Sequence, residues 1–286
     1  MRLEDMRRSD NVEDRRGLTV GRTGAGIGIG TIVLVIAGYV LGISPSTMLG
    51  LLGAGDAVTQ GAAATSASVP TGAPTDPQGD FAAAVLGETE DVWSKYFAAT
   101  GQHYTPPTLV LFTDQVASAC GTASAAAGPF YCSGDQKLYI DLGFFNQLST
   151  EFGAPGDFAR AYVIAHEVGH HLQNLLGITE KSERLSAQQG ATGAKRVSVA
   201  VELQADCYAG VWAMQAQRVI EPGELQQALQ AAAAVGDDTL QRRTQGRVVP
   251  ETFTHGSAEQ RERWFQRGFD GGKLASCDTF AGGQPL

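Results

Sequence analysis

The sequence predicts an α+β protein that is mainly helical, carries a small β-sheet or hairpin, and is preceded by one transmembrane helix. Three observations lead to this prediction: two long apolar segments with few charges at 161–178 and 197–217, strand-like stretches within 108–141, and an uncharged run at 25–43. With 286 residues, 43% of them hydrophobic, the chain can bury one sizeable core. Its net charge of -9 gives no electrostatic basis for nucleic-acid binding.

The uncharged run of nineteen residues at 25–43 is close to the length of about 20 residues that crosses a bilayer. Six arginines precede it, and no Lys or Arg follows until Lys95. The positive-inside rule therefore predicts a cytoplasmic N-terminal segment at 1–24 and a domain outside the cell. A cleaved signal peptide is the alternative, because the small residues at 62–67 offer a cleavage site. Residues 44–79, rich in Ala, Gly, Ser and Pro, are expected to form a flexible linker.

The remaining residues, 80–286, are expected to form one folded domain. Asp80 is a plausible N-cap for a first helix that carries apolar residues up to Phe97. Residues 108–112 are typical of a strand. Residues 130–141 predict a hairpin whose two-residue turn is Gly134-Asp135.

The strongest chemical signal is the H-E-x-x-H motif His166-Glu167-Val168-Gly169-His170 in the first apolar segment. On a helix, side chains four residues apart lie on one face, so both imidazoles can bind a single metal ion beside Glu167. The motif is short enough to occur by chance. A helix that is apolar on nearly every face is buried, however, and buried His and Glu side chains need a partner.

The second apolar segment supplies the missing ligand. Its only two charged residues before Gln217 are Glu202 and Asp206, which lie one turn apart on the same face. A catalytic zinc site has three protein ligands and one open position, so Glu202 is expected to complete the set. Asp206 is expected to accept the second ring N–H of a ligating histidine. Two solvated surface carboxylates are the alternative.

With these motifs, the chain resembles the bacterial neutral zinc metallopeptidase family, with ligands similar to those of the gluzincin peptidases. The stretches that carry the resemblance are 8–16, 128–132, 139–142, 161–177, 202–210 and 255–265, which together span nearly the whole chain apart from 53–79. The resemblance implies a zincin-like domain, Zn²⁺ at His166, His170 and Glu202, and Glu167 as the catalytic acid/base. The run at 25–43 adds an expected location at the bacterial cell membrane, with the catalytic domain outside the cytoplasm. By analogy with related peptidases, Leu138–Ile140 is a candidate edge strand for binding extended substrate; an ordinary structural strand is the alternative.

Four cysteines, at 120, 132, 207 and 277, lack C-x-x-C spacing and are poor zinc ligands. Of the three possible pairings we favour Cys120 with Cys132 and Cys207 with Cys277; buried free thiols are the alternative. The Ser257 capping box predicts a helix start, and His255 just before it is either a substrate-binding residue or an ordinary loop histidine. His171 points away from the motif face and is expected to pack or to support a ligand.

The predicted function is hydrolysis of peptide bonds in a protein or peptide substrate by a zinc-activated water, with Glu167 removing the proton and returning it to the departing amine. A membrane-tethered binding or scaffold protein with a structural or vestigial zinc site is the main alternative. Structural zinc sites usually have four protein ligands rich in cysteine, which favours the enzyme. Hydrolysis of a non-peptide bond is a third interpretation.

Overall fold

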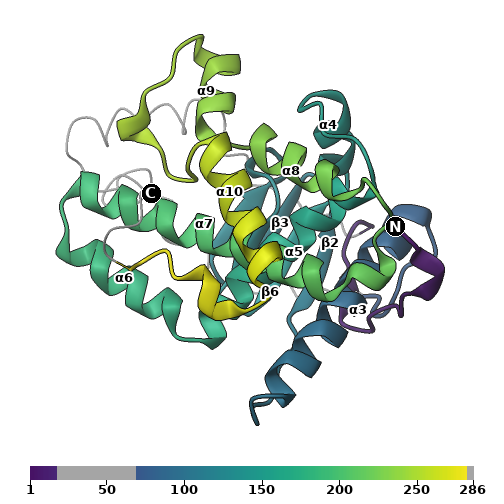
Figure 1. Ribbon diagram of the computed structural model, residues 1–286. Helices are drawn as coiled ribbons and strands as arrows, with labels where there is room; N and C mark the ends of the chain where they lie inside the picture. Colours follow the sequence, from purple (N-terminus) through teal and green to yellow (C-terminus); the bar gives the residue numbers. More distant parts are fainter. Residues whose placement is uncertain (18–68, 282–286) are drawn as a thin grey trace, which may run out of the picture. The chain divides into compact units, whose positions relative to one another are not determined.

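A four-stranded mixed sheet, a two-stranded hairpin and eight α-helices build the part of the chain that the computed structural model describes, residues 1–17 and 69–281 (Figure 1). This confirms the expected α+β class with mainly helical content. The helices are α3 (Pro77–Ala98), α4 (Gly143–Thr150), α5 (Asp157–Leu175), α6 (Ile178–Gln188), α7 (Ala191–Gln215), α8 (Leu225–Ala234), α9 (Asp237–Gln245) and α10 (Ala258–Gly271).

The larger sheet has the strand order β1-β2-β6-β5, formed by β1 (Val12–Asp14), β2 (Thr108–Phe112), β6 (Lys137–Asp141) and β5 (Phe130–Cys132). β1, β2 and β6 run parallel, and β5 is antiparallel to β6. The smaller hairpin pairs β3 (Gln115–Ser118) with β4 (Gly121–Ser124) and packs on one face of the larger sheet. The predicted strand at 108–112 is confirmed.

The predicted hairpin at 130–141 is also confirmed, with two corrections. Four residues, Ser133 to Gln136, connect its strands, and Gln136 adopts a positive φ of 57°, so the turn is longer than the expected two residues. Residues 138–140 lie in β6, which has β2 on one side and β5 on the other, so they are not an edge. β5 occupies the edge because the chain reaches β6 by folding back from it.

The first helix of the domain begins earlier than the sequence suggested. Asp76, not Asp80, is the N-cap of α3: its side chain accepts a hydrogen bond from the Gly79 amide at 3.0 Å, and Pro77 takes the first helical position. Asp80 lies inside the helix and binds Arg8 instead. Proline favours the first position of a helix because its missing N–H has no partner there in any case.

Residues 1–17 belong to the same compact unit as the residues from 69 onward, and α3 begins at Pro77, before the expected start of the domain at 80. The expected boundary at 24 lies outside the described residues. β1 pairs with β2, the Asp14 amide donates to the Pro70 carbonyl at 2.9 Å, and Arg16 forms an ion pair with Asp76 at 2.6 Å. The terminal amino group of Met1 pairs with Glu224. Residues 1–17 are therefore a structural part of the domain.

The expected membrane span at 25–43 lies outside the described residues, as does most of the expected linker at 44–79. Within the two described stretches, no helix is both long and apolar enough to cross a membrane.

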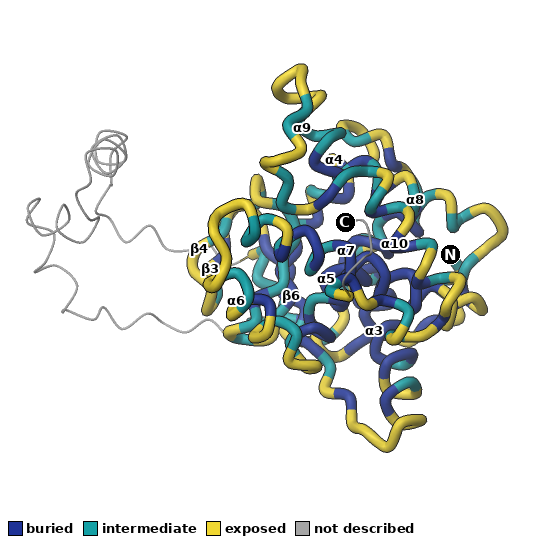
Figure 2. The backbone as a smooth tube through the Cα atoms, turned by 60° about the vertical axis from the view of Figure 1, so that its left-hand side comes forward, coloured by how far each residue is buried: buried dark blue, intermediate teal, exposed yellow. Residues whose placement is uncertain are grey.

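Helices α5 and α7 form the centre of the core, and Figure 2 shows both as largely buried. α5 contacts β5 and β6 as well as α7, while α10 packs along α7. The α7–α10 contact depends on glycine: a Cβ atom added to Gly268 would lie 1.9 Å from the Cys207 carbonyl oxygen. Both favoured disulfides are present; Cys120–Cys132 joins the small hairpin to β5, and Cys207–Cys277 ties the C-terminal segment to α7.

Candidate metal centre and active site

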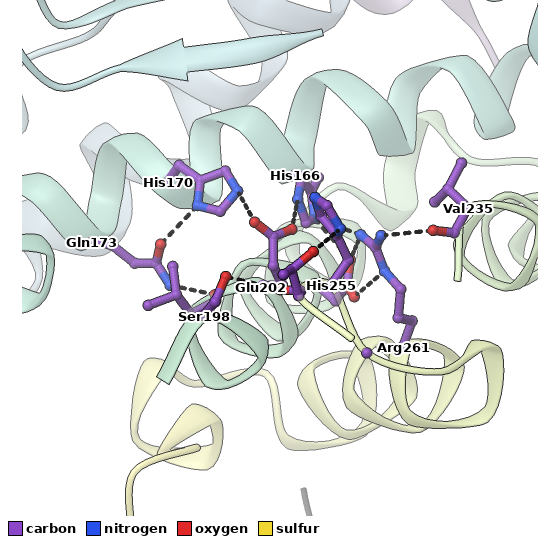
Figure 3. Close-up of polar contacts among 12 residues, drawn as sticks. His166, His170, Gln173, Ser198, Glu202, Val235, His255 and Arg261 are labelled. Carbon is purple, nitrogen blue, oxygen red and sulfur yellow. Dashed lines mark hydrogen bonds and ion pairs between the residues drawn. The ribbon is translucent and has the colours of Figure 1, made fainter. Parts of the chain in front are cut away.

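The two motif histidines lie on one face of α5, and Glu202 of α7 faces them (Figure 3). Glu202 Oε2 is 3.2 Å from His166 Nε2, and Glu202 Oε1 is 3.6 Å from His170 Nε2. One nitrogen from each imidazole and one carboxylate oxygen all lie within 4.8 Å of one another. The structure thus brings together three residues that the sequence separates by up to 36 positions.

The close approach of α5 and α7 makes this convergence possible. Gly169, inside the motif, faces Ala205 of α7, and a Cβ atom at Gly169 would lie 2.9 Å from the Ala205 carbonyl oxygen and 3.0 Å from its Cα. Any side chain there would push the helices apart. Because Glu202 lies one turn before Ala205, its distance from the imidazoles depends on this glycine.

Each motif histidine has its Nδ1 fixed by an acceptor, which leaves Nε2 for a metal. His166 Nδ1–H donates to Asp206 Oδ1 at 2.8 Å, the role expected for Asp206. His170 Nδ1–H donates to Gln173 Oε1 at 2.8 Å, and the Gln173 amide group in turn donates to the Val201 carbonyl at 2.7 Å. Such partners orient a ligating imidazole and fix its tautomer. Gln173 was missed in the sequence, although it lies one turn after His170.

The donor set fits zinc. Two imidazole nitrogens and one carboxylate oxygen, with each imidazole oriented by a hydrogen bond at its other nitrogen, are typical of a catalytic zinc site that keeps one position open. The four cysteines are paired in disulfides and take no part.

A buried charged network lies behind His166. Asp206 is fully buried and accepts hydrogen bonds from Arg261 Nε at 2.8 Å and from the Tyr162 hydroxyl at 2.5 Å. Burial by itself would raise the pKa of Asp206, but the charges of Arg261 and His166 outweigh it and lower that pKa. Asp206 is therefore ionised, and it holds both His166 and α10 in place. Neither Arg261 nor Tyr162 was among the site residues expected from the sequence.

Glu167 is buried at the wall of the same cleft. Burial raises the pKa of its carboxyl group above the usual range, against the opposing effect of His170 and His166. A carboxyl group whose pKa is moved toward neutrality is suited to both accepting and returning a proton.

The cleft has a volume of about 640 Å³ and opens onto Glu167 and all three candidate ligands. His255 also lines it, with half of its side chain exposed. Its Nδ1–H donates to Asp237 at 3.3 Å, and the same carboxylate accepts the backbone amides of residues 254–256, so the loop before α10 is fixed. The hydrogen bond that His255 donates to Asp237 raises the pKa of His255, although burial opposes it.

His171 lies outside the cleft and connects α5 to the sheet edge. Its Nε2–H donates to the Thr105 carbonyl at 2.7 Å, so its Nδ1 accepts from the Tyr131 hydroxyl at 3.1 Å. Asn174 donates to the same hydroxyl at 3.2 Å. Tyr131 lies on β5 and lines the cleft, so His171 supports the cleft wall, in keeping with the expected supporting role.

Comparison with known proteins assigns the chain to a family. The model of the family described as "Putative neutral zinc metallopeptidase" matches residues 1–280. The uncharacterized protein YpfJ of Escherichia coli K12 is 46% identical over 98% of this chain and 99% of its own length. The uncharacterized protein Rv2575 of Mycobacterium tuberculosis is 51% identical over 62% of this chain and 64% of its own. No solved structure matches the chain significantly. The chain therefore belongs to the "Putative neutral zinc metallopeptidase" family.

Proposed function

We propose that this protein is a zinc-dependent endopeptidase whose metal is held by His166, His170 and Glu202 and whose general base and acid is Glu167. The observation that carries the proposal is the convergence of three ligand atoms within 4.8 Å in a cleft that Glu167 also lines. A zincin-like assignment of the domain is part of the same proposal. Membrane attachment through residues 25–43 is a separate proposal, since that segment lies outside the described residues.

When bound, zinc supplies a Lewis acid that polarises the peptide carbonyl and lowers the pKa of a water molecule toward about 7. Glu167 accepts a proton from the attacking water and later delivers it to the nitrogen of the departing amine. His255 donates Nδ1–H to Asp237, and its protonated form, which the raised pKa favours, can donate a second hydrogen bond from Nε2–H to the oxygen that becomes negative during attack. Asp206 keeps His166 oriented throughout.

We expect an extended substrate to pair with β5, and not with Leu138–Ile140 of β6 as the sequence suggested. β5 is the sheet edge, and Phe130 and Tyr131 line the cleft. An extended peptide that adds to a sheet edge is held by main-chain hydrogen bonds.

The decisive experiment measures zinc content and cleavage of an unstructured protein by the full-length chain and two variants. The native protein is expected to contain one zinc ion and to lose cleavage when a chelator removes it. Glu167→Gln is expected to retain zinc and to lose cleavage by about 10² to 10⁴-fold. Glu202→Ala is expected to lose zinc itself. Full cleavage by Glu167→Gln would overturn the mechanism, and bound zinc without any cleavage would favour a binding protein.

A further inference from the structure

Five apolar side chains that line the cleft, four of them half-buried and one buried, form what we term the apolar wall. Its members come from four helices and one connecting segment: Phe144 of α4, Phe152, Val163 of α5, Val235 at the end of α8, and Leu240 of α9. The Phe144 and Phe152 rings are 6.1 Å apart. In the described structure these surfaces face the cleft rather than being completely covered by the core.

The apolar wall lies directly beside the proposed reacting groups. Val163 is one turn before Glu167 on the same face of α5. Val235 lines the same cleft as Glu167 and also borders the network behind His166, since its carbonyl is 3.4 Å from Arg261 Nη1 and Arg261 Nη2 is 3.4 Å from His166 Nδ1 (Figure 3). A group that occupies this part of the cleft would therefore belong to a residue next to the bond being cut.

The apolar wall carries no charge. Apart from the three proposed metal ligands, the basic and acidic residues that line the cleft are Glu167, His255 and Arg261. The charge of Arg261 is paired with Asp206. Arg243 lies outside the lining; it stacks over Phe152 at 6.0 Å and donates to the Glu151 carbonyl at 2.7 Å. A charged substrate side chain at the wall would lose its hydration without gaining a partner.

We propose that the apolar wall is the specificity subsite of this enzyme and that it binds a large apolar or aromatic side chain on one of the two residues that flank the scissile bond. This inference rests on the proposed peptidase function. Burying such a side chain against Phe144, Phe152 and Leu240 removes apolar surface from water on both partners. In a well-formed apolar pocket, even one methylene group changes kcat/KM by about tenfold or more.

The first test is a peptide library with every residue type at each position, digested by the full-length protein and read by mass spectrometry. Cleavage is expected at sites with Phe, Tyr, Leu or Met at one flanking position, with Phe favoured over Ala by at least about tenfold and over Asp by more. Cleavage with no apolar preference at either flank would overturn the subsite while leaving the peptidase function intact. Cleavage of no peptide by the zinc-loaded protein would overturn both.

The second test reduces the space of the subsite by enlarging one residue of the apolar wall. Leu240→Trp enlarges a half-buried side chain on a peripheral helix, and we expect it to lower the ratio of kcat/KM for the Phe peptide to that for the Ala peptide by about tenfold. Thr179→Trp is the matched control, because Thr179 also lines the cleft but lies on α6. The control is expected to leave that ratio unchanged. An unchanged ratio in Leu240→Trp, or an equal fall in both variants, would overturn the assignment.

Discussion

At the scale of single residues, His166 is held between two carboxylates. Burial would lower its pKa, but Asp206 at Nδ1 and Glu202 at Nε2 raise it to about 10. In the metal-free protein at pH 7, His166 therefore carries a proton on each ring nitrogen. Zinc binding at Nε2 must remove one of these protons.

The expected outcome is the release of about one proton for each zinc ion bound at pH 7, with affinity that falls as the pH is lowered. Zinc affinity falls at lower pH because, below the raised pKa of His166, a proton competes with the metal for Nε2. Isothermal titration calorimetry in buffers of different ionisation enthalpy measures the proton count. Zinc binding without proton release at pH 7 would show that His166 is neutral before the metal binds.

Tyr131 links the metal-binding helix to the sheet edge through His171 and Asn174. Removing its hydroxyl in Tyr131→Phe frees β5 from α5 while the ring remains. The variant loses two hydrogen bonds, each worth about 1 kcal/mol, which predicts a rise in KM of at least roughly fivefold with zinc content unchanged. Tyr139→Phe is the matched control, because the Tyr139 hydroxyl binds Asp135 and not α5. Steady-state kinetics of both variants decide the matter; equal KM values would contradict a role for Tyr131 in positioning β5.

At the scale of elements, the site depends on how closely α5 and α7 pack. Gly169→Ala would place a methyl group about 3 Å from the Ala205 backbone, at distances of 2.9 and 3.0 Å to its oxygen and Cα. Overpacking of this kind costs about 1–3 kcal/mol. Since the shift also moves Glu202 away from the imidazoles, zinc affinity is expected to fall together with stability. Urea unfolding with and without zinc measures both; an unchanged midpoint with full zinc content would show that the helices can adjust.

Several elements were predictable because their signals are local. β2 at Thr108–Phe112 is a continuous apolar stretch, and the α10 start at Ser257 is marked by a capping box that the structure shows to be complete. β1 was missed because Val12, Glu13 and Asp14 have no hydrophobic pattern. Its pairing depends on β2 and on residues 70–76, which lie far along the chain.

At the scale of the whole molecule, residues 12–14 lie next to residues 70–72, although 55 or more positions separate them in the sequence. The Gly72 amide donates to the Val12 carbonyl at 2.9 Å, and Glu13 forms a bridge with Thr71. A single membrane crossing at 25–43 would place β1 and β2 on opposite sides. The pairing and the topology expected from the positive-inside rule therefore make opposite predictions for the side of the membrane on which residues 1–17 lie.

We accordingly predict that residues 1–17 and the domain lie on the same side of any membrane to which the protein attaches. Single cysteines introduced at Glu4 and at Glu183, both exposed, can be labelled in intact cells with an impermeant maleimide. Because both positions are expected on the same side of the membrane, the maleimide should label both of them or neither. Labelling at one position only would mean that β1 does not pair within the chain in the cell.

The residues of the candidate site could be predicted without the fold, because the i, i+4 spacing of His166 and His170 and the placement of Glu202 and Asp206 on a second apolar helix follow from helix geometry and burial. Both disulfide pairings were also predicted. What surrounds these residues became visible only in the folded structure: Arg261 lies behind Asp206, Gln173 binds His170, β5 forms the sheet edge, and the N-terminal strand pairs within the sheet. The physical reason is range: helical periodicity acts between neighbours along the chain, whereas these contacts form only once distant segments share one core.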